Sequence, residues 1–358
     1  MTTKYSRNSD SNNVMPTVAI NLVLAETKVY SGESVRAQVV IDSADPDTIV
    51  HELVAEVRGT GKAGWVNIHT DKIYETEKDY IAATLNLVQQ STPLGQGRHQ
   101  FSFIADIPKN APSSYESQFG TIRYTIRISL ISNTANATLS ELFPFLVVTR
   151  AYFDDLPSAI MRQIEYTDEV DFTVCSLPFG TVYLKIIMPR TGYKLGENIP
   201  SKVCVKNSTR KALKDCKLQL VLKTQFEAMS RYEHVNEKKL LESVMDTFVL
   251  GRIKGRTEKD FEISNLKIPE NAVPSQYNRS EADPHIITMS YVVRFTALPG
   301  IETEIPLMIT SKGYKNIIRH GNEEQPQPQS TIRPPNINRP RHSIVESNVK
   351  SRGIAYYC

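Results

Sequence analysis

The sequence is poor in cysteine and contains no long apolar run. Its 358 residues include four cysteines, which show neither C-x-x-C pairing nor the density of a disulfide scaffold. We therefore interpret Cys175, Cys204, Cys216 and Cys358 as free thiols. No apolar run approaches the length that spans a bilayer, and the opening residues, MTTKYSRNSDSNNVMP, lack the apolar core of a secretory signal. These absences predict a cytosolic protein.

The chain also carries little excess charge of either sign. Its 42 lysines and arginines are balanced by 39 aspartates and glutamates, which gives a formal net charge of +3. A protein built mainly to neutralise nucleic-acid phosphates needs a larger basic excess, so we expect no nucleic-acid partner. A hydrophobic content of 40% with 8% aromatics suits globular cores, and the length suits two ordinary domains.

Signatures of catalysis and of metal binding are missing as well. No G-x-S-x-G, H-E-x-x-H or G-x-x-x-x-G-K-[ST] occurs, and the cysteines and scattered histidines show no spacing that closes a zinc site. The glycine cluster GTGKAG, residues 59–64, lacks phosphate-binding spacing, and we expect it to form a flexible loop around Trp65, the only tryptophan. We predict no catalytic residue, no cofactor, no bound metal and no enzymatic activity.

Short segments with alternating hydrophobicity are abundant. Apolar or small residues recur at every second position in four segments, 35–41, 122–130, 218–222 and 291–295, with polar residues mostly between them. This period of two is typical of strands with one face in a core. Such short runs, bounded by Gly, Pro, Asn and Asp, predict antiparallel β-sandwiches of immunoglobulin-like type.

The two halves of the chain resemble each other. The segment ADIPKNAPSS around Pro108 returns as LKIPENAVPS around Pro269, which is 161 residues later, and Tyr124 corresponds to Tyr291, which is 167 residues later. VYSGESV near Gly32 likewise returns as GYKLGENI near Gly196. Landmarks in one order at nearly one offset indicate a duplicated domain, since solenoid repeats have much shorter periods.

Composition suggests where the domains begin and end. We expect a flexible N-terminus over 1–15, a first sandwich over 16–150, a connection over 151–174 and a second sandwich over 175–311. The remaining residues, 312–358, are basic and rich in Pro, Gln, Asn and Ser, so we expect a disordered tail that cannot bury enough apolar area to fold.

Several ordered signatures resemble a known family. KVYSGESVRAQVVI, FIADIPKNAPSSYESQFGTIRYTIRISL, CSLPFGTVYLKIIMPRTGYKLGENIPSKVCV and ITMSYVVRFTALPGIETEIPLMIT are similar to successive signatures of the arrestin domain-containing proteins, the alpha-arrestins. The most specific is PSSYESQFGTIRY, from Pro112 to Tyr124, in which Tyr115 replaces the family's usual Phe and Ser117 its usual Gly. The resemblance covers about residues 18–310.

The resemblance implies a fold and a function. It implies an all-β protein of two tandem arrestin-type sandwiches that acts as a non-catalytic cytosolic adaptor. Such adaptors bind cytosolic segments of membrane-protein cargo and recruit HECT-type ubiquitin ligases, which promotes ubiquitination, endocytosis or endosomal sorting. Recruitment to the plasma membrane or to endosomes follows from that role. An alternative is a structural subunit of an endosomal coat, resembling the arrestin-fold component of retromer.

The tail departs from the family in its docking motif. The family usually recruits ligases through P-P-x-Y, which docks on WW domains in polyproline geometry, and no P-P-x-Y occurs in this chain. The candidate partner-docking residues are instead those of the segment RPPNINRPR: Arg333, Pro334, Pro335, Arg339 and Arg341. The alternative is a plain spacer. The basic residues of the tail either make peripheral contact with anionic membranes or simply keep a soluble tail extended by their charge. Two basic loops, 206–217 and 251–259, either grip phosphate groups or are simply solvated.

Overall fold

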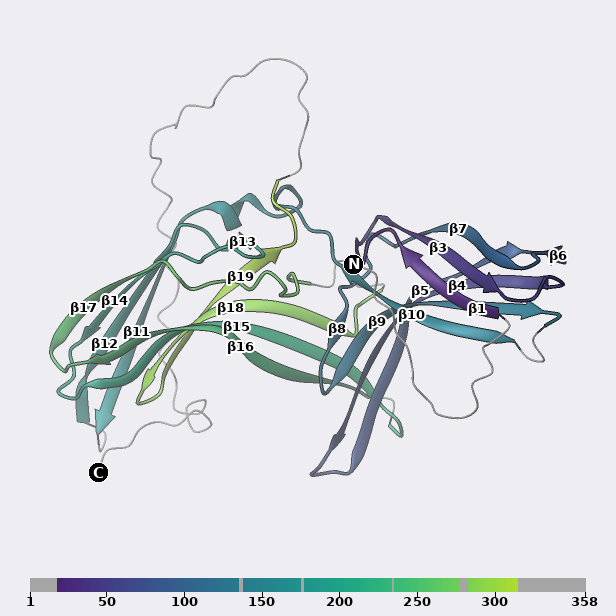
Figure 1. Ribbon diagram of the computed structural model, residues 1–358. Coiled ribbons are helices and arrows are strands. Elements are labelled where there is room, and N and C mark those ends of the chain that lie inside the picture. The colour runs from purple at the N-terminus through teal and green to yellow at the C-terminus, as the bar shows by residue number, and fades with distance from the viewer. Residues whose placement is uncertain (1–17, 135–137, 175–176, 234, 277–282, 315–358) are drawn as a thin grey trace, which may run out of the picture.

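A computed structural model describes residues 18–134, 138–174, 177–233, 235–276 and 283–314. In this part of the chain the regular structure consists of β-strands and two short 3-10 turns. The strands form two sandwiches that lie end to end in an elongated molecule (Figure 1). We call them the N sandwich and the C sandwich. The all-β fold with two tandem sandwiches, predicted from the sequence, is confirmed.

The N sandwich packs a three-stranded sheet, ordered β1-β3-β7, against a larger sheet, ordered β5-β4-β9-β10-β2. Its strands are β1 (Val18–Leu24), β2 (Lys28–Tyr30), β3 (Ser34–Ser43), β4 (Ile49–Asn67), β5 (Lys72–Val88), β6 (Thr92–Pro93), β7 (Gly97–Asp106), β8 (Tyr115–Glu116), β9 (Gly120–Ser132) and β10 (Leu139–Val148). The two short strands extend the larger sheet, β6 beside β4 and β8 beside β9.

The C sandwich packs a four-stranded sheet, ordered β11-β12-β14-β17, against strands ordered β13-β19-β18-β15, with β16 beside β15. Its strands are β11 (Ile164–Val174), β12 (Leu177–Met188), β13 (Gly192–Lys194), β14 (Ser201–Asn207), β15 (Leu213–Ser230), β16 (Asn236–Ile253), β17 (Thr257–Ile263), β18 (Ile287–Leu298) and β19 (Ile301–Thr310). Because β15 also pairs with β5, one continuous sheet runs through both sandwiches.

Period-two hydrophobicity explains why these segments form strands. The inward side chains of β9, from Ile122 to Leu130, and of β18, from Tyr291 to Phe295, are each at most 1% exposed, as their alternation predicted. Burial of a large apolar side chain contributes roughly 1.5–3 kcal/mol. A shift of one residue in register would turn every one of these side chains to solvent, so the pattern also fixes the register.

The internal repeat predicted from the sequence is present in the structure. In each sandwich a short strand pairs in parallel with the last strand, with Val29 opposite Val147 in one and Tyr193 opposite Ile309 in the other. Each short strand is followed by a turn through a glycine, Gly32 with φ +81° and Gly196 with φ +84°. Glycine suits both turns because other residues rarely adopt positive φ.

The expectation of a flexible glycine loop was wrong. Residues 59–64 lie within β4, paired on both sides with β5 and β9. The glycines make room for aromatic rings: a Cβ on Gly61 would meet the Tyr80 ring at 2.6 Å, and one on Gly59 would lie 2.5 Å from Cδ1 of the Tyr124 ring. Close approach of neighbouring groups, rather than backbone freedom, therefore explains this cluster.

The connection between the sandwiches is shorter than 151–174. It contains two 3-10 turns, η1 (Phe153–Asp155) and η2 (Ser158–Met161). From Ile164 the chain forms β11, which pairs with β12 inside the C sandwich. Several side chains of this charged strand, including Val170 and Phe172, pack on the core.

Candidate protein-interaction site

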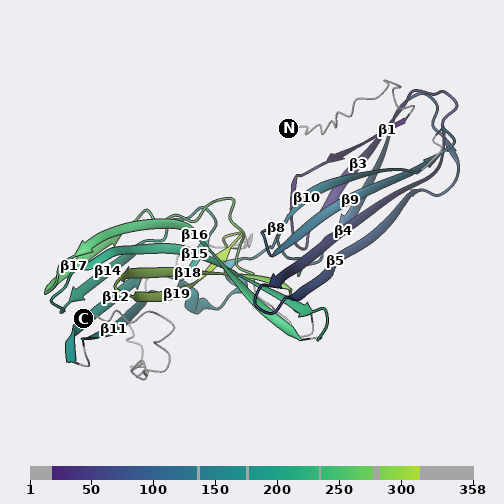
Figure 2. The same ribbon diagram turned by 90° about the horizontal axis from the view of Figure 1, so that it is seen from below.

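Two long hairpins, one from each sandwich, meet side by side (Figure 2). The β4–β5 hairpin belongs to the N sandwich and the β15–β16 hairpin to the C sandwich. Ser230 pairs with Tyr74 and Met229 with Glu75, and the Arg231 amide donates to the Ile73 carbonyl at 3.0 Å. Backbone hydrogen bonds therefore join the two domains at the ends of their hairpins.

An aromatic and cationic contact reinforces this junction. Trp65 stacks on Tyr74 with ring centroids 5.5 Å apart. The Lys239 ammonium group of β16 lies 5.7 Å from the Trp65 ring and 4.2 Å from the Phe119 ring. A hydrogen bond with Glu237 of β16, together with burial, raises the pKa of Tyr74. Trp65 is consequently 8% exposed and packs at the domain junction.

The charges at the hairpin ends neutralise one another across the domain boundary. Lys72 forms an ion pair with Glu233 at 2.7 Å, and Arg231 forms one with Glu75 at 2.8 Å. Exposed pairs of this kind contribute less than about 1 kcal/mol each, so they do not dominate the junction. Their main effect is to leave the hairpin ends without a strong charge of either sign.

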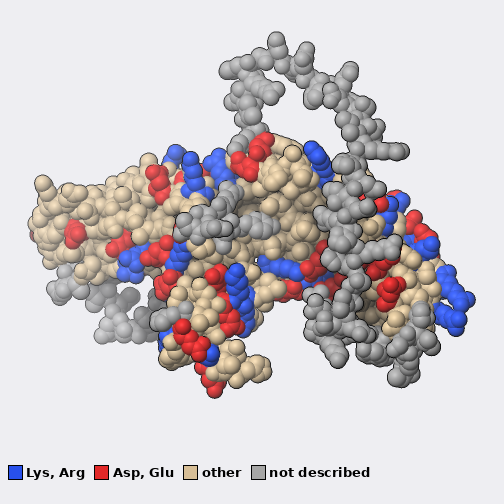
Figure 3. Space-filling model, turned by 180° about the vertical axis from the view of Figure 1, so that it is seen from behind, with Lys and Arg blue, Asp and Glu red and all other residues tan. Residues whose placement is uncertain are grey.

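Large apolar side chains project from these neutralised ends. The exposed fractions are 81% for Ile68, 69% for Tyr232, 56% for Val235 and 53% for Val66. We call these four residues the hairpin tip patch. In the view from behind, a projection of the surface carries red and blue side chains among uncharged ones (Figure 3). Apolar groups gathered on a surface and rimmed by polar groups typically mark an interaction site.

Sequence reasoning missed the hairpin tip patch. Its members come from two turns about 165 residues apart, and only the pairing of β15 with β5 brings them together. A usable signal did exist, since Val66 and Ile68 in VNIHTD and Tyr232 in SRYEH are apolar or aromatic residues at turns, where polar residues are usual. The docking residues predicted instead, Arg333, Pro334, Pro335, Arg339 and Arg341, lie outside the described residues, so their role stays a prediction.

The two basic loops of the C sandwich lie together. Their side chains line a shallow hollow of about 320 Å³ formed by Lys206, Asn207, Ser208, Arg256, Thr257 and Glu258. Asn207 joins the loops: its amide nitrogen donates to the Lys211 carbonyl at 2.8 Å and to the Lys254 carbonyl at 3.2 Å. Its oxygen accepts from the Thr209 hydroxyl at 2.7 Å. Phosphate binding by these loops stays a prediction.

We expect Asn207→Ala to destabilise the C sandwich by about 2 kcal/mol, because two carbonyls lose the donor that a 1% exposed side chain supplies. Urea unfolding followed by circular dichroism measures the change. The neighbouring Ser208→Ala is the matched control, since Ser208 is exposed and we expect its removal to leave the midpoint unchanged. Equal midpoints for the two variants would contradict the role of Asn207.

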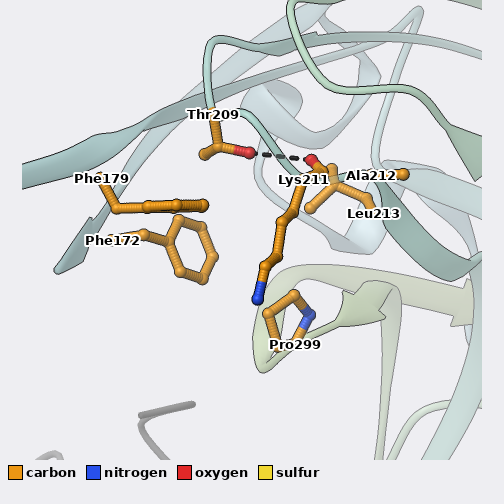
Figure 4. A pocket seen from close by; sticks show the side chains of 7 residues that line it. All are labelled: Phe172, Phe179, Thr209, Lys211, Ala212, Leu213 and Pro299. Atoms are coloured by element: carbon orange, nitrogen blue, oxygen red, sulfur yellow. Dashed lines mark hydrogen bonds between the residues drawn. The ribbon is translucent and has the colours of Figure 1, made fainter. Parts of the chain in front are cut away.

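A second hollow lies beside these loops and is too small for a ligand. Phe172, Phe179, Pro299 and the Thr209–Leu213 loop surround it (Figure 4). Its volume of about 10 Å³ is the space of one water molecule at most. We therefore assign it no binding role.

Other candidate chemistry is sparse in the part of the chain that the structure describes. Cys204 and Cys216 are free thiols, and burial raises the pKa of each to about 11, so neither is a reactive thiolate. Among the described residues no group of three His, Cys, Asp or Glu side chains is placed to bind a metal. No helix there has the length and hydropathy needed to cross a membrane. Cys175 and Cys358 lie outside the described residues.

An ion network covers the outer face of the C sandwich. Arg294 pairs with Glu304 at 2.6 Å and with Glu242 at 2.7 Å, and Lys223 pairs with Glu304 at 2.5 Å. Between them, Val221 pairs with Val292 across β15 and β18 on the outer face. Although they face outward, these valines are 0% and 7% exposed, which fits a cover of charged side chains.

Comparison with known proteins agrees with this architecture. The family described as "Arrestin (or S-antigen), N-terminal domain" matches residues 19–148, and "Arrestin (or S-antigen), C-terminal domain" matches residues 178–314. The chain is 52% identical over 301 residues to arrestin domain-containing protein 15 of Caenorhabditis elegans, covering 84% of this chain and 80% of that protein. It is 24% identical over 318 residues to human arrestin domain-containing protein 5, covering 84% and 90% respectively. The chain therefore belongs to the family of arrestin domain-containing proteins.

Proposed function

We propose that this protein is a non-catalytic adaptor that binds cytosolic segments of membrane proteins through the hairpin tip patch. The observation that carries the proposal is the apolar surface that both sandwiches present where their hairpins meet. Membership of the arrestin domain-containing family supports it. Patches of this kind gain affinity by burying a few large side chains, and Tyr232 and Ile68 are the most exposed members.

The adaptor's downstream role is the second part of the proposal. The bound membrane protein would be directed to ubiquitination, endocytosis or endosomal sorting, with a HECT-type ligase as partner and with the plasma membrane or endosomes as the place of action. Because the sequence contains no P-P-x-Y, the tail residues Arg333 to Arg341 are our candidates for recruiting the ligase machinery.

Proximity labelling in cells tests the patch. In the full-length chain, we expect Ile68→Asp with Tyr232→Asp to lower labelling of membrane proteins tenfold or more, because losing two anchors of roughly 1–2 kcal/mol each weakens binding by about thirtyfold or more. Val249→Asp is the matched control, since Val249 is 64% exposed but lies near the other end of β16. Unchanged labelling by the double variant would contradict the proposal.

The same labelling separates the downstream roles. We expect Pro334→Ala with Pro335→Ala to keep membrane proteins labelled and to lose ubiquitin ligases. Labelling of coat subunits at a constant ratio to the protein, with no ligase labelled by any variant, would instead support a structural subunit of an endosomal coat.

A further inference from the structure

The duplicated motif makes the same local contacts in both sandwiches. The Tyr124 hydroxyl donates to the Pro112 carbonyl at 2.6 Å, and the Tyr291 hydroxyl donates to the Val273 carbonyl at 2.6 Å. Two residues further on, Ser114 and Ser275 each exchange two hydrogen bonds with the last strand of their own sandwich, at Val147 and at Ile309. These matching bonds align the two copies residue by residue.

The next residue in each copy reaches into the other sandwich. In the first copy this residue is Tyr115, whose hydroxyl lies 3.0 Å from the hydroxyl of Thr224 on β15. In the second copy it is Gln276, whose carbonyl oxygen accepts from the Ser113 amide at 3.1 Å and from the Thr149 hydroxyl at 3.4 Å. Equivalent positions of a duplicated sequence therefore tie the domains together in both directions.

The polar groups that form these ties are buried, so the ties resist a change in the orientation of the two sandwiches. Gln276 is 3% exposed, and its amide nitrogen donates to the Ile287 carbonyl at 3.3 Å, so both ends of the amide are satisfied. Ser113 and Thr224 are each 1% exposed. If the sandwiches moved apart by a few ångströms, these polar groups would stay buried without partners. That loss costs more free energy than the loss of an exposed ion pair.

The surrounding contacts fit the same role. The Tyr115 and Phe119 rings lie 6.4 Å and 5.9 Å from the ring of Phe226, which comes from β15. Gly120 of β9 lets Phe226 approach, since a Cβ there would stand 3.0 Å from Cδ1 of that ring. Apolar contacts are non-directional, so they hold the domains together without fixing the angle between them. Hydrogen bonds weaken when the donor–acceptor distance or angle changes.

We infer that Tyr115 and Gln276 are positioning residues that set the orientation of the two sandwiches. They act as reciprocal ties, and the exposed ion pairs at the hairpin ends contribute little to the angle. The orientation of the sandwiches also aligns the two turns of the hairpin tip patch. The importance of that alignment for binding is the only part of the inference that rests on the proposed function.

The test measures the distance between the sandwiches in the full-length protein. Spin labels on ketone-bearing amino acids at positions 100 and 259, which lie on exposed parts of β7 and β17, leave the native cysteines untouched. Double electron–electron resonance then gives the distribution of distances. We expect a narrow distribution for the unsubstituted protein and at least a twofold broader one for Tyr115→Phe combined with Gln276→Met.

The control acts on the ion pairs at the hairpin ends. Lys72→Met with Glu233→Gln removes a cross-domain pair without touching the ties, and we expect it to leave the distribution unchanged. Should the double tie variant fold poorly, Tyr115→Phe removes a single oxygen, and we expect intermediate broadening. A distribution unchanged in the folded tie variants, or broadened only in the ion-pair variant, would overturn the inference.

The distance measurement needs no partner, so its outcome is independent of the proposed adaptor function. Broadening together with weaker labelling of membrane proteins would support both proposals. Broadening with unchanged labelling would support the ties and separate them from the hairpin tip patch.

Discussion

Gly59→Ala is expected to lower the free energy of unfolding of the N sandwich by about 3 kcal/mol or more, as overpacking of a closed core does. A Cβ on Gly59 would lie 2.5 Å from Cδ1 of Tyr124 and 2.7 Å from Cγ2 of Ile81, well inside van der Waals contact. Tyr124 cannot move aside, because its ring is 1% exposed and its hydroxyl is bonded to the Pro112 carbonyl.

Intrinsic fluorescence measures this effect in urea or on heating. Trp65 is the only tryptophan and lies on the same strand as Gly59, so its emission reports unfolding of the N sandwich and opening of the domain junction. Gly313→Ala is the control, since a Cβ there meets no atom within 4 Å and the expected change is near zero. A Gly59→Ala protein as stable as this control would show that the Tyr124 ring has room to move.

Arg294→Met is expected to destabilise the C sandwich by about 3 kcal/mol at pH 7, because removal of one partner leaves carboxylates poorly compensated. The Arg294 side chain is 13% exposed and contacts Glu242, Glu302 and Glu304, so only Lys223 would remain to balance them. Methionine keeps most of the side-chain volume over Val221 and Val292, so the change reports charge more than packing.

The effect should depend on pH in a defined direction. Hydrogen bonding from Arg294 lowers the pKa of Glu242. Burial raises the pKa of Glu304, but hydrogen bonds from Lys223 and Arg294 outweigh burial and lower it overall. Since these folded pKa values lie below the unfolded value of about 4.3, the stabilisation is complete above that pH and is lost as the pH falls further.

Urea unfolding of both proteins at pH 7 and at pH 3.5 checks this prediction. We expect the difference between the unsubstituted protein and Arg294→Met to shrink at the lower pH, where the glutamates take up protons. Arg98→Met is the control, because its pair with Asp42 is 3.8 Å long and largely exposed. A difference that stays constant between the two pH values would mean that packing, rather than charge, accounts for the loss.

Patterns in the sequence were enough to predict the fold class and the duplication. Strict alternation along 122–130 and 291–295 predicted strands with one buried face, because side chains in a strand point to opposite faces in turn. The recurrence of Pro108 at Pro269 and of Tyr124 at Tyr291 predicted two copies of one domain. Each of these inferences depends on residues close together in the chain or on comparing one half with the other.

Local signals were insufficient where long-range contacts decide the structure. Glycine favours loops, so the local sequence predicts a loop over 59–64, yet the rings of Tyr80 and Tyr124 require glycine in the middle of a strand. Likewise the charged outward residues of β11 predict a connecting segment, although the strand belongs to the C sandwich. An edge strand exposes one face and one edge, so its composition resembles that of a linker.

Only the tertiary structure brought the candidate site and the domain ties together. Ile68 and Tyr232 share a surface because β15 pairs with β5. No local sequence pattern predicts that two turns so far apart in the chain lie together. In the sequence, Tyr115 and Gln276 are ordinary members of a repeated motif. Their role in orienting the domains depends on the residues of the other sandwich that they contact. Strand periodicity is a property of neighbours in the chain, whereas the orientation of two domains is set by hydrogen bonds between residues more than a hundred positions apart.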